Sequence, residues 1–344
     1  MEEKRVAEFD EWYQKNYSLY DQCGKRAKEL LTLLLNQNGL AFHSIDCRIK
    51  EKESYLNKCK LSKYTDPINQ ITDVCGLRII SYTNHDVKEI AKLIDKEFFV
   101  DNENTIDKHS EMDADRVGYL SVHYIVRFNS SRTELTEYSL YKDIRFEIQV
   151  RTLLQHAWAE IEHDRNYKFG GELPREIKRR FYLLAGMLEI VDTEFDRLSN
   201  EIDEYAETVK HKAEQGELDV PIDSTSLIEY LQIKFPTEVI QKDFNGRDKM
   251  IIDELKSFGV ATLKDLDLII TTDFINSQHR RGIVPNYLGL IRDIMMAHNP
   301  KKYFENAWQG HWYACGKNEL AELISINPDI KKYAEKLSIT DEDN

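Results

Sequence analysis

Apolar residues change their spacing several times along the first 180 residues, which predicts a mixture of helices and strands. Five of them share one helical face between residues 26 and 36 and predict an amphipathic helix; they are Ala27, Leu30, Leu31, Leu34 and Leu35. Residues 86 to 96 predict another helix. Three runs rich in β-branched and aromatic residues predict strands, because such side chains suit a pleated surface. These runs cover residues 76 to 82, 119 to 128 and 145 to 150.

A longer apolar repeat follows in alternating steps of three and four residues. It comprises Phe181, Leu184, Leu188, Val191, Phe195, Leu198, Ile202, Tyr205 and Val209. A seam of this kind, about four heptads long, predicts one long helix, which we place at residues 175 to 210. Two interpretations of the seam stay open. Either the helix packs on its own domain, or residues 181 to 209 join copies of the chain in a homo-oligomer.

The periodicity ends between residues 211 and 226, where Gly216, Pro221 and a polar cluster indicate a linker. This predicts two domains, residues 1 to 215 and residues 222 to 344.

The second domain shows short helical patterns, so we expect it to be small and all-helical. Gly259 is expected to be a C-cap and Thr262 the next N-cap. The aromatic-rich residues 303 to 313 predict a small core. We expect this domain to regulate the first one, either by covering its substrate site or by sensing a partner. The sequence does not identify the ligand or partner.

Composition limits the kinds of partner. The chain has 344 residues, of which 41% are hydrophobic and 31% charged, as is typical of a folded soluble protein. Its formal net charge of −14 argues against a general nucleic-acid-binding surface, which needs clustered Lys and Arg. Five cysteines without a CxxC pair predict neither a zinc ribbon nor a disulfide framework. No signal region or run of about 18 apolar residues occurs, so we expect a cytoplasmic protein.

The common nucleotide-binding and hydrolase fingerprints are absent from the sequence. A P-loop needs Gly, four residues, then Gly-Lys-Ser/Thr, but the Gly-Lys at residues 316 and 317 is followed by Asn318. The motifs GxGxxG, HExxH and GxSxG are also missing. A nucleotide enzyme with this sequence must use another scaffold.

Polar side chains share one face of the predicted strands. Alternation along residues 145 to 151 opposes an apolar face to a polar face that holds a carboxylate between cations. The apolar face comprises Phe146, Ile148 and Val150, and the polar face comprises Arg145, Glu147, Gln149 and Arg151. A surface strand would also show this pattern.

Two further features lie near the other predicted strands. Tyr119, Ser121 and His123 share one face, which suits a nucleobase and its ribose. Asp73 precedes the run at 76 to 82, where a carboxylate could hold Mg²⁺ together with substrate phosphates. A core tyrosine and a turn aspartate are the ordinary interpretations.

A basic cluster lies upstream, in the segment CRIKEKESYLNKCK. It contains Arg48, Lys50, Ser54 and Lys58. Polyphosphate needs such charges, and solvated charge on a helix surface is the alternative.

Together these segments resemble the synthetase domain of the RelA/SpoT family, which makes the alarmones (p)ppGpp. The matching segments are CRIKEKESYLNKCK, ITDVCGLRII, GYLSVHY and FEIQVRTLLQHAWAEIEHDRNYK. The resemblance covers about residues 40 to 180 and is greatest to the small stand-alone synthetases, which often form tetramers. It implies an α+β fold of the nucleotidyltransferase type, with a mixed β-sheet flanked by helices.

The resemblance also implies a reaction and roles for named residues. The reaction is the Mg²⁺-dependent transfer of the pyrophosphate of ATP to the 3′-hydroxyl of GDP or GTP, which gives (p)ppGpp and AMP. Asp73 and Glu147 would be the catalytic carboxylates that coordinate Mg²⁺. ATP would be bound by Arg48, Lys50, Ser54, Lys58 and Arg78. The acceptor would be bound by Tyr119, which stacks on guanine, and by Ser121, His123, Gln149 and Arg151.

One position departs from the family. Its guanosine loop commonly carries a Lys four residues before the stacking Tyr, where this chain has Asp115. A carboxylate there would repel the 5′ diphosphate of the acceptor, although Arg116 or Lys108 could replace the Lys. Other acceptors therefore stay open. They are adenosine nucleotides and, as in some toxin relatives, the 3′ end of tRNA, whose phosphates the basic stretch KRRF at residues 178 to 181 could bind. A catalytically silent nucleotide-binding regulator is a further alternative.

Residues 155 to 163 place His156, Glu160 and His163 near one helical face, but without the spacing of a zinc motif. We expect a structural helix there that buries Trp158 and Ile161 beneath the active site.

Overall fold

A computed structural model describes residues 2–107, 122–169, 174–235, 248–281, 286–308, 310 and 314–340. The chain divides into two compact units, Met1–Ser199 and Asn200–Asn344. The division falls within the long helix α7 (Arg175–Glu214), whereas the sequence placed a linker between residues 211 and 226. That residues 1 to 215 form a complete catalytic domain stays a prediction.

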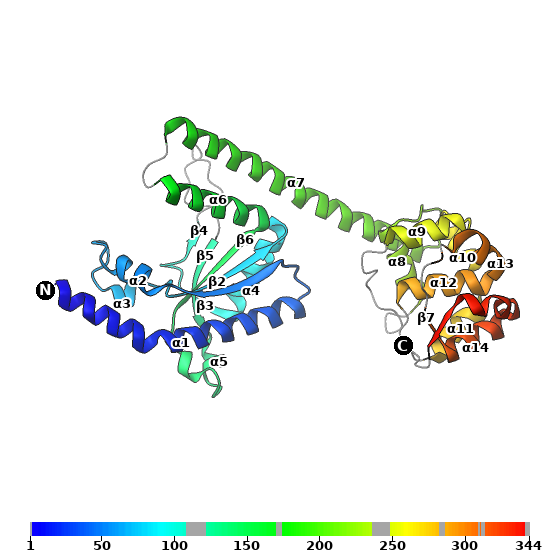
Figure 1. The fold of residues 1–344 in the computed structure, drawn as a ribbon, viewed down its shortest axis with the longest axis horizontal. Coiled ribbons are helices and arrows are strands. Elements are labelled where there is room, and N and C mark those ends of the chain that lie inside the picture. The colour runs from blue at the N-terminus through cyan, green and yellow to red at the C-terminus, as the bar shows by residue number, and fades with distance from the viewer. Residues whose placement is uncertain are drawn as a thin grey trace. The chain divides into compact units, whose positions relative to one another are not determined.

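The first unit is built on a mixed sheet with the strand order β1-β2-β6-β5-β3, and β4 pairs with β5. The strands are β1 (Ser44–Ile49), β2 (Cys75–Ser81), β3 (Phe98–Val100), β4 (Ile106–Asp107), β5 (Val122–Phe128) and β6 (Phe146–Thr152). β2 and β6 run parallel, while β1 and β5 pair with them antiparallel. The predicted α+β class, a mixed sheet flanked by helices, is confirmed (Figure 1).

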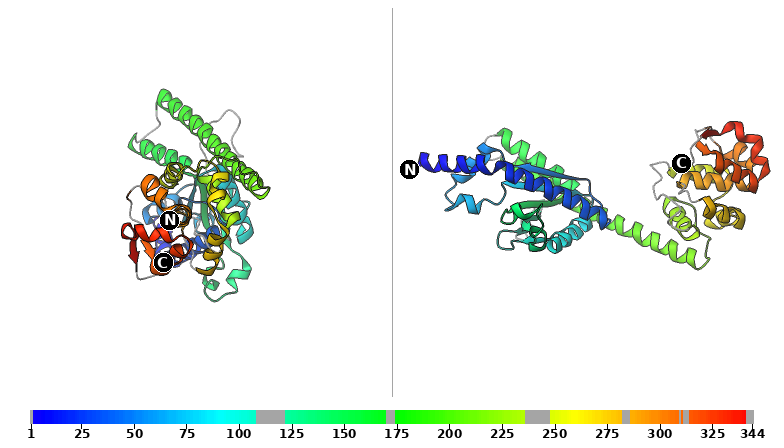
Figure 2. Two further views of the ribbon diagram at one scale, coloured as in Figure 1. Left: turned by 90° about the vertical axis from the view of Figure 1, so that its right-hand side faces the viewer. Right: turned by 90° about the horizontal axis from the view of Figure 1, so that it is seen from below.

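The core of this unit lies between one face of the sheet and the helices α1 (Glu2–Gln37) and α4 (Asn84–Glu97). In the view from below, α1 runs across the sheet (Figure 2). Alternate residues of β2 and β6 enter this core and are almost fully buried, namely Leu77, Ile79, Phe146, Ile148 and Val150. Their neighbours in sequence therefore point to the opposite face. The predicted helices at 26 to 36 and 86 to 96 correspond to the end of α1 and to α4.

Gly24, in the interior of α1, marks a close approach between the helix and the sheet. A Cβ at this position would lie 2.5 Å from Cys47 Sγ and 2.8 Å from Cys75 Sγ. Glycine costs a helix interior about 1 kcal/mol relative to alanine. The two thiols explain why glycine stands here, because a larger residue would collide with them.

Shorter helices and α6 complete the first unit. They are α2 (Lys52–Cys59), α3 (Pro67–Gln70), α5 (Ser130–Thr133), the 3₁₀ turn η1 (Ser139–Tyr141) and α6 (Leu153–Phe169). α6 follows β6 directly and contacts β2 and β6.

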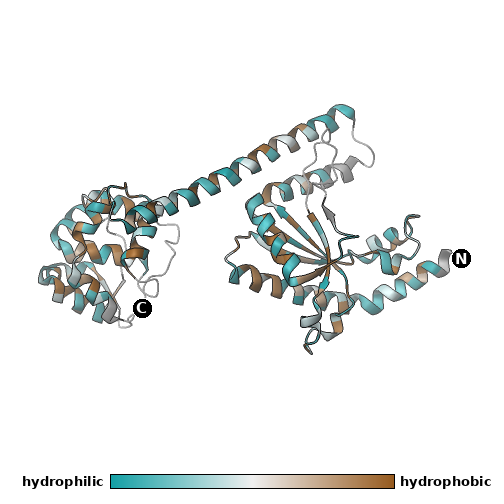
Figure 3. Cartoon of the chain, turned by 180° about the vertical axis from the view of Figure 1, so that it is seen from behind, coloured by the Kyte–Doolittle hydropathy of each residue, from teal (hydrophilic) through white to brown (hydrophobic). Residues whose placement is uncertain are grey.

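α7 packs on the first unit through residues that lie largely outside the predicted seam. Ala185 and Asp192 of α7 are each only 1% exposed. Most of the seam is exposed to solvent, with Leu184, Val191, Phe195, Leu198 and Ile202 between 41% and 58% exposed. Hydrophobic patches recur along α7 in Figure 3. One seam residue, Leu188, packs against Trp158 and Ala185, so the seam supplies only a small part of the contact of α7 with its own sheet domain.

The second unit is helical around one core, apart from a short parallel pair of strands. Its helices are α8 (Ser224–Lys234), α9 (Asp248–Ser257), α10 (Leu263–Ile269), α11 (Thr272–Arg281), α12 (Tyr287–His298), α13 (Pro300–Lys302), the π-helical turn η3 (Tyr303–Ala307), α14 (Lys317–Ile326) and the 3₁₀ helix η4 (Pro328–Lys336). The strands are β7 (Ala314–Gly316) and β8 (Ser338–Thr340).

The local signals expected in the second unit are present. Gly259 follows α9 with φ at +82°, and Thr262 caps α10 through a reciprocal bond with Asp265. Tyr303 and Phe304 are buried in the core, as the aromatic-rich stretch predicted. Within the described ranges, no helix combines the length and the apolar character needed to cross a membrane.

Candidate active site

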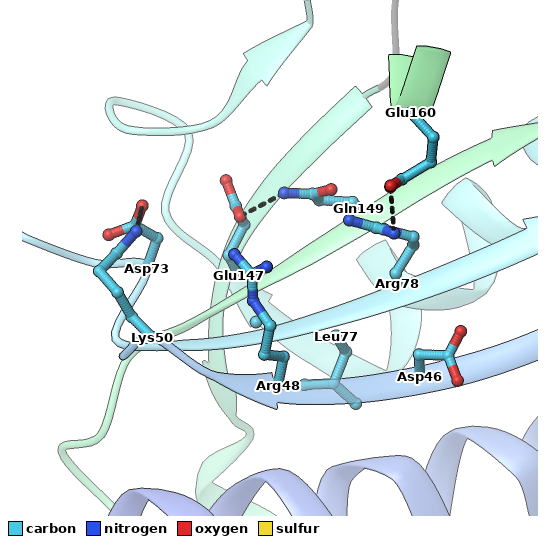
Figure 4. Close-up of a pocket in the computed structure, with 10 residues that line it drawn as sticks. Asp46, Arg48, Lys50, Asp73, Leu77, Arg78, Glu147, Gln149 and Glu160 are labelled. Carbon is cyan, nitrogen blue, oxygen red and sulfur yellow. Dashed lines mark hydrogen bonds and ion pairs between the residues drawn. The ribbon is translucent and has the colours of Figure 1, made fainter. Parts of the chain in front are cut away.

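A polar pocket of about 320 Å³ opens on the face of the sheet that points away from the core (Figure 4). Strands β1, β2 and β6 supply most of its lining, and α6 adds one residue. The lining comprises Asp46, Arg48, Lys50, Asp73, Gly76, Leu77, Arg78, Glu147, Gln149 and Glu160. Charged side chains therefore dominate the pocket.

The strand register explains how distant residues meet in this pocket. Arg48 pairs with Gly76 across β1 and β2, and Gly76 pairs with Glu147 across β2 and β6. Because Gly76 has no side chain, it leaves space in this row between the guanidinium and the carboxylate. A second row joins Asp46, Arg78 and Gln149. Period-two alternation places all these side chains on the same face.

Asp73 lies just before β2 and is held by two lysines. Its Oδ2 atom is 2.7 Å from Lys58 Nζ and 3.0 Å from Lys50 Nζ. Burial alone would raise the pKa of this carboxyl, but the two ammonium groups outweigh burial and lower the pKa below its usual value. The carboxylate is therefore ionised at neutral pH, and it neutralises cations that a phosphate would otherwise meet.

Glu147 is held by two neighbours on the same face. Its Oε1 atom is 2.7 Å from His123 Nδ1, and its Oε2 atom accepts a hydrogen bond from Gln149 Nε2 at 2.7 Å. Burial raises the pKa of this carboxyl, but the contact with His123 outweighs burial, and the net pKa is lowered. Asp73 acts in the opposite direction, since two like charges face one pocket.

The two carboxylates fit a magnesium site completed by substrate. Among the described residues, no group of three or more His, Cys, Asp or Glu could hold a metal by itself. Mg²⁺ commonly takes one or two carboxylates plus phosphate oxygens, which matches Asp73 and Glu147. In addition, Asp73 Oδ1 is buried without a hydrogen-bond partner, so it is available to a ligand.

A cationic cluster lies at the far end of the pocket. Arg78 Nη1 is 2.9 Å from Glu160 Oε1 on α6. Arg151 is 6% exposed and donates a hydrogen bond to Gln149 Oε1. Burial and the nearby Arg78 lower the pKa of Arg151 to about 10, and the same two causes lower the pKa of His156. This end of the pocket can bind an anion or stack on a planar base.

Most residues predicted for the site are brought together. The pocket is lined by Arg48, Lys50, Asp73, Arg78, Glu147 and Gln149. Lys58, His123 and Arg151 contact lining residues directly. Ser54 is exposed on α2 and is not among the lining residues. Tyr119, Ser121, Lys108, Asp115 and Arg116 lie outside the described residues.

Four lining residues were not predicted for this pocket, namely Asp46, Gly76, Leu77 and Glu160. Alternation along residues 44 to 50 would have placed Asp46 beside Arg48 and Lys50, had that segment been interpreted as a strand. Trp158 of α6 is buried as expected, at 8% exposure, but the prediction for Ile161 is wrong, since it is 55% exposed. The buried side of α6 packs against Ala185 through Trp158 and Leu154, and this contact does not include Ile161.

Comparison with known proteins decides the family. The family model described as the region found in RelA / SpoT proteins matches residues 47–172. GTP pyrophosphokinase YjbM of Bacillus subtilis (strain 168) is 30% identical over 176 residues, which are 49% of this chain and 78% of that protein. The chain belongs to the RelA/SpoT family. The family match includes all the lining residues except Asp46 and ends before α7 begins.

Other relatives of this RelA/SpoT protein each match about half of the chain. GTP pyrophosphokinase YwaC of Bacillus subtilis (strain 168) is 24% identical over 171 residues, which are 45% of this chain and 73% of that protein. The crystal structure of small alarmone synthetase 1 from Bacillus subtilis aligns with a TM-score of 0.48 and 26% identity, over 57% of this chain and 99% of that one.

Proposed function

We propose that this protein is a GTP diphosphokinase, which transfers the pyrophosphate of ATP to the 3′-hydroxyl of GDP or GTP in a Mg²⁺-dependent reaction in the cytoplasm. The observation that carries the proposal is the convergence of Asp73 and Glu147 on one pocket lined by Arg48, Lys50 and Arg78. Family membership and relatives named GTP pyrophosphokinase support it.

The cations of the pocket would bind ATP, with Ser54 on the neighbouring helix α2 as a further proposed contact. Lys50 and Lys58 can exchange their contact with Asp73 for phosphate oxygens when a nucleotide enters. Asp73 would then be free to hold Mg²⁺ together with Glu147. When bound, the metal neutralises charge on the transferred phosphoryl oxygens.

The acceptor hydroxyl attacks the β-phosphorus of ATP in line, the bond to the α,β-bridging oxygen breaks, and AMP leaves. Positioning and electrostatic stabilisation would supply most of the rate. Glu147 could take the hydroxyl proton, but its lowered pKa makes it a weak base. The acceptor would lie on the side of β5, near His123, Gln149 and Arg151, with Tyr119 and Ser121 as further proposed contacts.

The acceptor is the part of this proposal that an experiment must decide. Purified protein should be incubated with Mg²⁺, ATP labelled in its γ-phosphate, and GDP, GTP, ATP or bulk tRNA in separate reactions. Label in a guanosine nucleotide would support the proposal. Label in tRNA or in adenosine nucleotides would replace it with the toxin-type alternatives suggested by Asp115. If no acceptor becomes labelled, a silent nucleotide-binding regulator is the better description.

Two proposals concern the rest of the chain. We propose that the second unit regulates the reaction, so removing everything after residue 215 should change the rate. An unchanged rate and unchanged cellular toxicity would contradict this role.

We also propose that the exposed seam of α7 joins copies of the chain. Sedimentation velocity should show an oligomer that Val191→Glu dissociates and Thr193→Glu, on another side of α7, does not; a monomeric wild type would exclude it.

A further inference from the structure

Two aspartates of α7, one helical turn apart, bind the first unit through hydrogen bonds. Asp192 is 1% exposed, and its Oδ2 atom accepts a hydrogen bond from Thr152 Oγ1 at 2.6 Å. Asp196 Oδ1 accepts a hydrogen bond from the backbone N–H of His85 at 2.7 Å. Residues four apart in sequence lie on the same side of a helix, so both aspartates face the sheet domain together.

Each of these bonds reaches the beginning of a helix. Thr152 precedes α6 and forms a reciprocal cap with Gln155: the backbone N–H of Gln155 donates to Thr152 Oγ1 at 3.1 Å, and that of Thr152 donates to Gln155 Oε1 at 2.9 Å. His85 lies in the first turn of α4. Helix N-termini carry partial positive charge, which favours a carboxylate at both places.

These two helices begin where the two parallel strands of the pocket end. β2 ends at Ser81 shortly before α4, and β6 ends at Thr152 directly before α6. The strands are paired without a break from Gly76 opposite Glu147 to Ser81 opposite Thr152. Residues of the pocket alternate along this ladder, so its register fixes where Arg78, Glu147 and Gln149 point.

We propose that Asp192 and Asp196 are positioning residues, through which α7 holds the ends of β2 and β6 and thereby the geometry of the pocket. The inference rests on the proposed function only in taking this pocket as the ATP site. Its consequence is that α7, which continues into the second unit, is mechanically tied to the strand that carries Glu147.

Simple packing does not account for a buried aspartate at this place. Burying a carboxylate is unfavourable unless hydrogen bonds compensate for lost hydration, and apolar contacts would attach a helix at lower cost. α7 already makes such a contact two turns earlier, where Ala185 packs against Trp158. Asp192 adds orientation, because one hydroxyl both caps α6 and donates to the carboxylate.

The test uses the full-length protein and compares Asp192→Ala, Asp192→Asn, Thr152→Val and Thr152→Ser. Glu189→Gln is the matched control, because it changes an exposed acid one turn away on the same helix. Three quantities are measured below the melting temperature of every variant: kcat and KM for ATP, affinity for a non-hydrolysable ATP analogue with Mg²⁺, and hydrogen exchange at the first turns of α4 and α6.

We expect Asp192→Ala and Thr152→Val to lower kcat by about 10- to 100-fold, the scale of a small misplacement of reacting groups, with KM for ATP changed by less than about threefold. The double variant should be no worse than the worse single one, since both remove the same bond. Thr152→Ser, which keeps the hydroxyl, should restore kcat, and Asp192→Asn, which keeps an acceptor, should lie between.

Wild-type kcat in Asp192→Ala, or additive losses in the double variant, would overturn the inference. The same holds if Glu189→Gln is equally impaired. If the wild type binds no ATP analogue, the proposed function fails instead. Hydrogen exchange then decides the inference by itself, because loss of Asp192 must increase exchange at the first turn of α6, which Thr152 caps.

Discussion

Replacing Asp73 with Asn should separate ATP binding from pyrophosphate transfer. The carboxylate is 2.7 and 3.0 Å from the ammonium groups of Lys58 and Lys50, and all three side chains are less than a third exposed. At an effective dielectric constant of about 20, each contact corresponds to a Coulomb energy of about 6 kcal/mol, most of which is offset by lost hydration. Asn removes this attraction and leaves two ammonium groups without their anion.

Two opposite effects follow for the variant. Without metal, in excess EDTA, Asp73→Asn should bind ATP at least about tenfold more tightly than wild type, since roughly 1.4 kcal/mol of the released attraction suffices. With Mg²⁺, transfer should fall about 1,000-fold, which corresponds to roughly 4 kcal/mol for a lost metal ligand.

The assays are calorimetric titration of ATP in EDTA and release of AMP from labelled ATP in Mg²⁺. Glu53→Gln, an exposed acid on the helix that carries Lys58, is the control and should change neither quantity. Weaker metal-free binding by Asp73→Asn, or transfer within about threefold of wild type, would refute the role assigned to this carboxylate.

Three further substitutions test other parts of the structure. Glu147→Gln should abolish transfer. Because the folded-state pKa of this carboxyl is lowered, its contribution to stability is present above the unfolded value of about 4.3 and is lost only as pH falls through the lower folded value. A pH titration of wild-type activity should therefore show no carboxylate-linked loss between pH 5 and 8, and a midpoint within that range would contradict this. Gly24→Ala should lower the melting temperature by an amount equivalent to about 1–3 kcal/mol, although alanine favours helices. In a background where the two facing cysteines are replaced with alanine, the same substitution should instead raise the melting temperature. Arg292→Met leaves Glu254 buried without its bidentate partner and should destabilise the second unit by about 3–5 kcal/mol, whereas adding Glu254→Leu should recover most of the loss in a denaturant titration.

Much of the first unit could be predicted because its signals are local. Alternation along residues 145 to 151 correctly separated the core face of β6 from its pocket face, since period two is a property of any strand. The segment around Arg48 was harder, because four charged residues in succession, at 50 to 53, directly follow the short strand β1 and hide its alternation. Its place became clear only through pairing with β2, which is a contact between distant residues.

Contacts between helices and strands could not be predicted from the spacing of apolar and polar residues. The seam of α7 correctly predicted a long helix, but the period alone does not say which face is covered. The face that packs on the sheet domain includes Asp192, and a search for apolar periodicity does not detect a buried polar residue. Likewise, the link between Lys58 and Asp73 joins two segments whose separation in sequence carries no signal.

The charges of the resting pocket nearly cancel. Four carboxylates line the pocket, on Asp46, Asp73, Glu147 and Glu160. Five cations line it or contact its lining directly, on Arg48, Lys50, Arg78, Lys58 and Arg151. Such a pocket offers little long-range attraction to free phosphate or other simple anions, so these anions alone should not occupy it. The choice of ligand then depends on short-range contacts. Only a ligand that brings phosphate oxygens for the cations and a cation for the carboxylates can replace all the ion pairs within the pocket at once. Occupancy should accordingly vary little with ionic strength, unlike that of an open basic groove.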